Sequence, residues 1–334
     1  MLRHAVAAVL LVALFGAHNV ANAVHTVDSK AGATLVDADL TAKMVFQAHY
    51  AWAAGCHVGR LSMGWDCDSI CGDPTTAGTK VLGVLKNPLR QNSYSGFVAL
   101  QPDNATIVFA IQGTESLQDA ATDIVLLPTF NIQKRFPGAP LLSSVHVGFF
   151  NLFEAGIPSI QSAIDTILPQ YPWVKRLVFT GHSLGAIQQN LNVPYFGPGL
   201  LAKGYKIETF AFAPARTVNN VFAKYLSTLP VLADGSFYRI VQRQDIIPAI
   251  LAQVAPTFYR HIGTEYFVNV DAPGQTAPIY KCPSPALGEE NWYCFNSVSP
   301  LEFSLIPGHT DYLGMNYWGC AVLAILLDYL KPSS

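Results

Sequence analysis

The pentapeptide Gly181-His182-Ser183-Leu184-Gly185 constrains the fold of this chain more than any other stretch. The apolar run before it, residues 176–180, reads as a short buried strand, and residues 184–191 after it can form a helix. A sharp turn from strand to helix strains the backbone of the central serine, and flanking glycines let the two elements come close because they lack a Cβ atom. The pattern therefore predicts Ser183 as an exposed nucleophile, with the Leu184 amide available to stabilise an oxyanion.

Strand-like and helix-like segments alternate along the rest of the chain. This alternation predicts an α/β fold, with a mostly parallel central sheet flanked by helices in a single domain. A turn at Pro102-Asp103-Asn104 joins the first two predicted strands as a hairpin. Those two strands are expected at 96–101 and 106–112, and later strands at 206–213 and 237–241 in addition to 176–180. Helices are expected at 39–55, 116–127, 151–168, 184–191 and 318–330.

The N-terminus has the features of a secretory signal. Arg3 and His4 precede an apolar run over residues 5–17, and the small-residue sequence Ala21-Asn22-Ala23 follows. The run is short for a membrane span, which needs about 20 residues. We therefore expect cleavage after Ala23, a mature domain over residues 24–334, and an extracellular location.

Composition narrows the class of protein further. The net charge is −2 and the basic residues are scattered, which argues against a nucleic-acid partner. All the cysteines lie in the predicted mature chain, as expected in an oxidising compartment, but their spacing does not reveal their pairing. They do not form a zinc-binding pattern, and we expect no metal or other cofactor. The tripeptide Asn104-Ala105-Thr106 is an N-glycosylation acceptor in the predicted hairpin turn.

A serine hydroxyl needs a base and an orienting acid, which follow such an elbow in the order serine, acid, histidine. Asp245 lies just beyond the predicted strand 237–241, at the sheet edge where open α/β folds gather their chemistry. Two downstream histidines, His309 and His261, remain as candidate bases, and the loop around His309 makes it the preferred one. Thr114 follows a strand end and a glycine, so it can supply a second oxyanion donor.

Six sequence blocks, in order, resemble the class 3 (fungal-type) lipase family, which contains secreted triacylglycerol lipases and feruloyl esterases. The resemblance extends from about Leu40 to Cys320. The blocks are 107–114, 145–149, 178–185, 212–216, 239–248 and 308–314.

The resemblance implies an α/β-hydrolase fold and assigns roles to individual residues. It places the catalytic triad on Ser183, Asp245 and His309 and the oxyanion donors on Thr114 and Leu184, and it makes His261 non-catalytic. It implies the disulfides Cys56–Cys320, Cys67–Cys71 and Cys282–Cys294. It also implies a lid from Ser116 to about residue 127 that includes Leu117, Ala120 and Ile124, with Ala120 where lipases carry a tryptophan.

The function expected from these features is a secreted serine hydrolase of carboxylic esters, a triacylglycerol lipase or carboxylesterase that works through an acyl-enzyme. The alternatives are a feruloyl esterase, which a polar lid would suit, and a catalytically silent lipid-binding relative. The expected partners are an ester substrate such as an acylglycerol and, transiently, a lipid interface. We expect the protein to be a monomer.

Overall fold

The structure is a computed structural model that describes residues 32–55, 61, 64–67, 70–86, 94–113, 127–251, 258–270, 277–284, 287–304 and 307–316. Several predictions lie outside these residues. They are the signal peptide over residues 1–23, the oxyanion residue Thr114, the lid positions Ser116, Leu117, Ala120 and Ile124, the Cys56–Cys320 disulfide, and the helix at 318–330.

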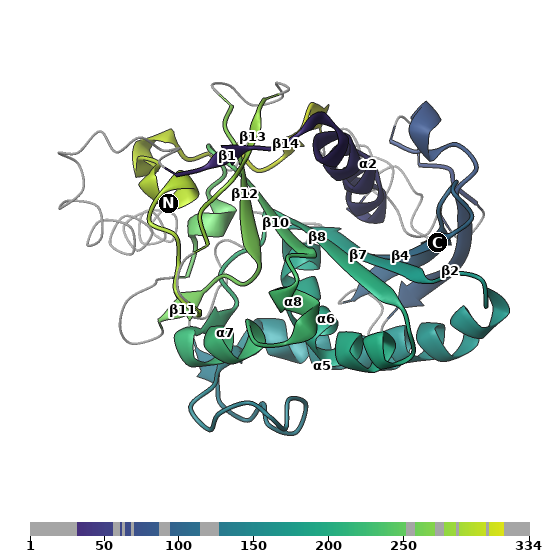
Figure 1. Cartoon of the computed structure of the whole chain (residues 1–334), viewed down its shortest axis with the longest axis horizontal. Helices are drawn as coiled ribbons and strands as arrows, with labels where there is room; N and C mark the ends of the chain where they lie inside the picture. The colour runs from purple at the N-terminus through teal and green to yellow at the C-terminus, as the bar shows by residue number, and fades with distance from the viewer. Residues whose placement is uncertain are drawn as a thin grey trace, which may run out of the picture.

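A sheet of nine described strands runs through the centre of the molecule (Figure 1). The five strands in its middle are parallel to one another, and antiparallel strands extend the sheet on both sides. The α/β architecture predicted from the sequence is therefore confirmed. In spatial order the strands are β1 (Thr34–Leu35), β13 (Ile279–Lys281), β12 (Thr264–Val268), β10 (Phe237–Gln242), β8 (Lys206–Phe212), β7 (Arg176–His182), β4 (Thr106–Ile111), β3 (Ser95–Leu100) and β2 (Lys80–Lys86).

Helices cover both faces of this sheet. Helix α2 (Ala38–Gly55) lies on one face, and α5 (Val147–Thr166) and α6 (Leu184–Ala202) lie on the other (Figure 1). The strands are apolar on both sides because each face packs on a helix layer, which produces one hydrophobic core on each side of the sheet. Asp37 caps α2, since its carboxylate accepts the amide of Leu40 at 2.8 Å.

Smaller elements complete the described chain. A second sheet has the order β11 (Tyr259–Arg260), β9 (Val218–Asn219), β6 (Val145–His146) and β5 (Pro128–Thr129). The pair β14 (Asp311–Tyr312) and β15 (Met315–Asn316) follows late in the chain. The short helices are α7 (Asn220–Leu226) and α8 (Pro230–Ala233), with 3₁₀ turns η1 (Pro74–Thr76), η2 (Leu168–Gln170), η3 (Ile247–Ala249), η4 (Cys294–Ser297) and η5 (Pro300–Glu302).

The structure differs from the sequence prediction in several elements. Strands β2, β12 and β13 were not predicted. Helix α5 begins at Val147 rather than at residue 151, because the imidazole of His146 caps it by accepting the Phe149 amide at 3.4 Å. Helix α6 continues past residue 191 through two prolines, although each removes a backbone donor. Burial of most of this helix in the core stabilises it despite that loss.

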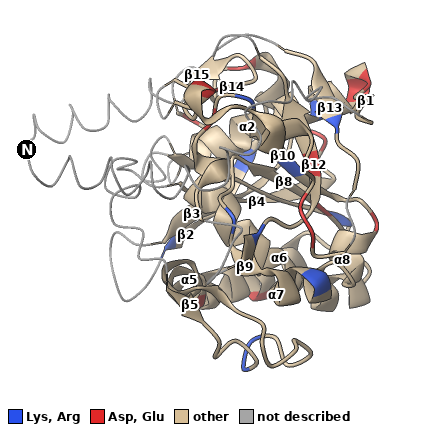
Figure 2. Ribbon diagram, turned by 90° about the vertical axis from the view of Figure 1, so that its left-hand side faces the viewer, with Lys and Arg blue, Asp and Glu red and all other residues tan. Residues whose placement is uncertain are grey.

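The surface and hydropathy of the described elements add two observations. Among the described residues, the acidic and basic positions are dispersed along the ribbon rather than gathered on one element (Figure 2). Within the described part of the chain, the helices are all too short or too polar to cross a membrane.

Candidate active site

Ser183 occupies the sharp turn between β7 and α6. Its backbone has φ 55° and ψ −123°, a conformation that L-residues rarely adopt and that costs on the order of 1–3 kcal/mol. Hydrogen bonds on both sides hold the turn, because the Ser183 amide donates to the Phe212 carbonyl at 2.9 Å and the Ile187 amide donates to the Ser183 carbonyl at 3.0 Å. The strained turn that the Gly-x-Ser-x-Gly pattern predicts is thus present, but the prediction that Ser183 is exposed is wrong, because only 5% of its surface is accessible.

The start of α6 lies directly against the end of β4. A Cβ atom added to Gly185 would lie 2.1 Å from the Ile111 carbonyl oxygen, so only glycine fits at this position. Leu184 is the first residue of α6, where backbone amides have no partner within the helix. The chain leaves β4 through Gly113 at the same place, where an added Cβ atom would lie 2.9 Å from the His182 carbonyl oxygen.

Asp245 and His309 form a buried pair. The Nδ1 atom of His309 lies 2.9 Å from both carboxylate oxygens of Asp245, and both side chains are fully buried. A carboxylate accepts hydrogen bonds, so we assign the ring hydrogen to Nδ1. The other ring atom, Nε2, is then an acceptor, and among the described residues it has no hydrogen-bond partner.

Two further donors fix the Asp245 carboxylate. The amide of Ile247 donates to Oδ1 at 2.8 Å, and the hydroxyl of Tyr312 donates to Oδ2. The Tyr312 oxygen in turn accepts the amide of Gln242 at 3.0 Å. Burial, followed by the nearby Asp245 carboxylate, raises the pKa of Tyr312 well above its usual value, so this hydroxyl keeps its proton.

The loop that carries His309 packs tightly against the loop that carries Asp245. The side-chain amide of Gln242 donates to the Gly308 carbonyl at 3.0 Å. A Cβ atom on Gly308 would lie 2.3 Å from the Gln244 carbonyl oxygen, so this close approach also requires glycine. The histidine and the carboxylate are therefore held together by backbone contacts as well as by their own hydrogen bonds.

His182 connects the elbow to the same loop. Its Nε2 atom donates to the backbone carbonyl of His309 at 3.0 Å, and the two imidazole rings lie 4.4 Å apart between centroids. Burial, with a smaller effect of His309, lowers the pKa of His182 well below 6.5, so the ring is neutral at pH 7. These contacts give His182 a structural role beside Ser183.

The structure places the other sequence candidates as follows. His261 donates through Nε2 to the Pro248 carbonyl at 3.0 Å rather than to Asp245, so its ring is not oriented by the acid. The disulfides Cys67–Cys71 and Cys282–Cys294 are present. Asn104 is exposed, with φ 51°, in the turn between β3 and β4. The contact of Tyr312 with Asp245 was missed, because no sequence spacing indicates it.

One described cluster has the ligand types of a metal site. Glu265, Cys282 and Cys294 bring their ligand atoms within 4.8 Å of one another, but the two sulfurs are bonded to each other as a disulfide. Because a disulfide offers no thiolate, this cluster does not fit a metal.

Comparison with known proteins shows which family this chain resembles. Residues 108–255 match the family described as lipase (class 3). A lipase from Rhizopus niveus is 29% identical over 77% of this chain, and a secreted mono- and diacylglycerol lipase A from Penicillium cyclopium is 26% identical over 52% of this chain and of its own length. The crystal structure of a lipase from Rhizopus microsporus var. chinensis superimposes with a TM-score of 0.70 and 26% identity, covering 86% of this chain and 92% of that one. The match to the Rhizopus niveus lipase covers 59% of its length.

Proposed function

Residues 108–255 of this chain belong to the class 3 lipase family, and from this premise we propose that the protein is a serine hydrolase that cleaves carboxylic esters. The observation that carries the proposal is the combination of a strained serine at a strand-to-helix turn with a buried histidine–carboxylate pair. Acyl transfer needs this set of groups, because a serine hydroxyl is a weak nucleophile without a base.

In the proposed mechanism Ser183 attacks the ester carbonyl while Nε2 of His309 takes the hydroxyl proton. His309 then gives this proton to the leaving alcohol, and water releases the acyl group in a second cycle. Asp245 holds the imidazole in the tautomer with hydrogen on Nδ1 and stabilises its charged form. The amides of Leu184 and Thr114, with the Thr114 hydroxyl, donate to the oxyanion. The acceptor at Nε2, which has no hydrogen-bond partner among the described residues, and the position of Leu184 at the start of α6 support these roles.

We propose acylglycerols as the substrate class and the extracellular space as the location. The names of the relatives support both points, since the Penicillium protein is called a secreted mono- and diacylglycerol lipase. The predicted signal peptide, with cleavage after Ala23, agrees with secretion. In this view the lid of residues 116–127 meets the lipid surface transiently, and the protein acts as a monomer.

A labelling and hydrolysis experiment tests the proposal. A fluorophosphonate probe should label the wild type and fail to label Ser183→Ala, and the wild type should hydrolyse p-nitrophenyl esters and emulsified triglyceride. Absence of labelling in the folded wild type would identify a catalytically silent relative. Faster hydrolysis of methyl ferulate than of every acyl ester would instead favour the feruloyl esterase alternative.

A further inference from the structure

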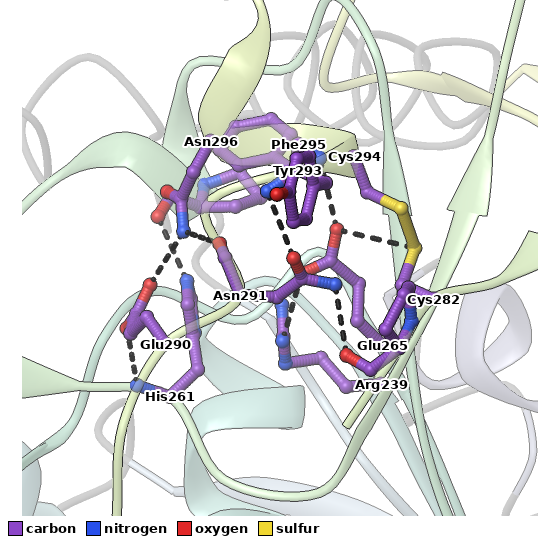
Figure 3. A network of polar contacts seen from close by, with 12 residues as sticks. Arg239, His261, Glu265, Cys282, Glu290, Asn291, Tyr293, Cys294, Phe295 and Asn296 are labelled. Atoms are coloured by element: carbon purple, nitrogen blue, oxygen red, sulfur yellow. Dashed lines mark hydrogen bonds and ion pairs between the residues drawn. A yellow bond between two sulfur atoms is a disulfide. The ribbon is translucent and has the colours of Figure 1, made fainter. Parts of the chain in front are cut away.

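A buried polar cluster lies beside the loop that follows Asp245. It consists of Arg216, His261, Glu290 and Asn296 and is called the Arg216 cluster below. Glu290 is its centre, because its Oε1 accepts Arg216 Nε at 3.1 Å. Its Oε1 also accepts the His261 amide at 2.7 Å, and its Oε2 accepts the Asn296 side chain at 3.0 Å (Figure 3). Arg216, His261 and Glu290 are 4%, 7% and 5% exposed, so their polar contacts are almost entirely within the protein.

Two further donors of this cluster, Arg216 Nη1 and His261 Nε2, point to backbone carbonyls of residues 246–251, called the acid loop below. Arg216 Nη1 donates to the Ala249 carbonyl at 2.8 Å and to the Leu251 carbonyl at 3.2 Å. His261 Nε2 donates to the Pro248 carbonyl at 3.0 Å. The cluster thus holds three carbonyls of the six residues that follow Asp245 directly.

The acid loop is linked to the carboxylate itself. The Ile247 amide donates to Asp245 Oδ1, and the amides of Ala249 and Ile250 donate back to Ile246 and Ile247. A shift of this short turn would therefore move the Asp245 carboxylate relative to His309. Misplacement by about 1 Å can cost a catalytic site about 100-fold in rate.

The protonation states of His261 and Glu290 match the contacts that the cluster makes. Burial lowers the pKa of His261 well below 6.5, an effect that Glu290 opposes and that Arg239 and Arg216 reinforce. The ring is then neutral with its hydrogen on Nε2, as donation to a carbonyl requires. Burial acts to raise the pKa of Glu290, but Arg216, His261 and Arg239 lower it below its usual range, so the carboxylate is charged.

The Cys282–Cys294 disulfide closes the loop that carries Glu290, the acidic partner of Arg216. Glu290 lies inside the disulfide-closed loop, and Asn296 lies two residues beyond Cys294. The Phe295 amide anchors the end of this loop on the Glu265 carboxylate at 2.9 Å (Figure 3). A loop closed in this way loses less conformational entropy when it delivers Glu290 and Asn296 to Arg216.

We propose that Arg216, His261 and Glu290 are positioning residues that hold the acid loop so that Asp245 stays bonded to His309. The proposal rests on the proposed function of Ser183, Asp245 and His309. It gives His261, one of the two candidate bases in the sequence, an indirect part in the reaction.

A matched pair of substitutions tests this inference. Arg216→Lys keeps the charge but loses the planar set of donors that reaches Glu290 and two carbonyls. Arg239→Lys is the control, because Arg239 is equally buried and pairs with Glu265 at 2.9 Å without a hydrogen bond to the acid loop. We expect both variants to lower the thermal midpoint. Only Arg216→Lys should lower kcat for a soluble p-nitrophenyl ester, by about tenfold or more, with KM changed by less than about twofold.

Two measurements test positioning without using activity. The first is the downfield proton resonance of the His309 Nδ1–H group, assigned by its loss in His309→Gln. The second is hydrogen exchange of a peptide that spans residues 246–251. Arg216→Lys should weaken or shift the resonance and speed the exchange, and Arg239→Lys should change neither.

The outcomes separate the two proposals. Unchanged kcat, resonance and exchange in a folded Arg216→Lys protein would overturn the positioning role, as would equal effects in Arg239→Lys. If the wild type hydrolyses no ester, the proposed function fails, and the resonance and exchange measurements still decide whether the Arg216 cluster orders the acid loop. If Arg216→Lys does not fold, Glu290→Gln provides the same comparison, since it keeps an acceptor for the His261 amide but loses the charge that binds Arg216.

Discussion

Two buried neutral histidines should make the protein lose stability in mildly acidic solution, above the range where carboxylates titrate. His182 and His261 are 1% and 7% exposed, and burial lowers the pKa of both well below 6.5. Below about pH 6.5 the unfolded chain therefore binds protons on these residues and the native state does not. By linkage, stability is fully present above that pH and falls as the pH is lowered.

The size of this effect follows from the unfolded-state titration. Each histidine lowers the free energy of unfolding by at most about 1.4 kcal/mol for each pH unit of acidification. Between about pH 8 and about pH 5 this amounts to at most about 2 kcal/mol. The two histidines together can lower the free energy of unfolding by at most about 4 kcal/mol. Burial raises the pKa of Glu265, and the destabilisation that this causes is relieved as the pH falls, so the observed loss should be somewhat smaller. Glu290 has a lowered pKa, so its stabilisation is lost only at more acidic pH.

Urea unfolding of the wild type and of His261→Gln over this pH range provides the test. Glutamine keeps a side-chain N–H donor but does not titrate. The variant should be less stable near pH 8, and on going to about pH 5 it should lose less stability than the wild type, by at most about 2 kcal/mol. Equal pH slopes for the two proteins, or a wild type whose stability is flat over this range, would refute the reasoning.

The other predictions concern the proposed site and the covalent modifications. Ser183→Ala and His309→Ala should each lower kcat by about 10³-fold or more while the circular dichroism spectrum is unchanged, and activity at a tenth of wild type would place the chemistry elsewhere. Mass spectrometry of the unreduced protein should find no free thiol. Reduction of Cys282–Cys294 should lower the free energy of unfolding by about 3 kcal/mol in the loop-entropy model, and an unchanged thermal midpoint would contradict this. Secretion from a eukaryotic host should give a glycan that PNGase F removes and that Asn104→Gln abolishes, whereas a protein of unmodified mass would contradict an exposed acceptor. The family resemblance implies Ala120 where lipases carry a lid tryptophan, an exchange that forfeits roughly 2–4 kcal/mol of the free energy favouring lid opening. The rate on tributyrin should therefore rise only modestly at its solubility limit, and a tenfold jump would indicate a closed lid.

The sequence predicted the part of the site that follows local rules. The Ser183 turn was predictable because the two glycines, the preceding apolar strand and the following helix all lie within about ten residues. Asp245 was placed correctly at the end of a parallel strand, since that edge collects polar side chains in this fold class. Between His309 and His261 the pattern gave only a preference for His309, and the family resemblance made the assignment. What distinguishes them in the structure is whether Asp245 or the Pro248 carbonyl accepts their ring hydrogen.

The features that the sequence did not predict depend on distant residues. Arg216 and Glu290 are 74 residues apart, and Tyr312 and Asp245 are 67 apart, so no periodicity relates them. The short strands β12 and β13 form because the sheet provides them with a hydrogen-bonding edge. The length of α6 is decided by burial, which outweighs the tendency of Pro194 and Pro198 to end a helix.

The order of residues in the chain also affects when the site forms. Ser183 lies in a turn made by adjacent segments, β7 and α6, but 64 residues separate Asp245 from His309, and 127 separate His182 from the carbonyl that it holds. Contacts of such long sequence separation form late, because the intervening chain must first be ordered. During refolding, far-ultraviolet circular dichroism should therefore recover before ester hydrolysis does. A nascent chain that has emerged only as far as β10 contains Ser183 but neither Asp245 nor His309, so the proposed triad predicts that it cannot yet hydrolyse esters.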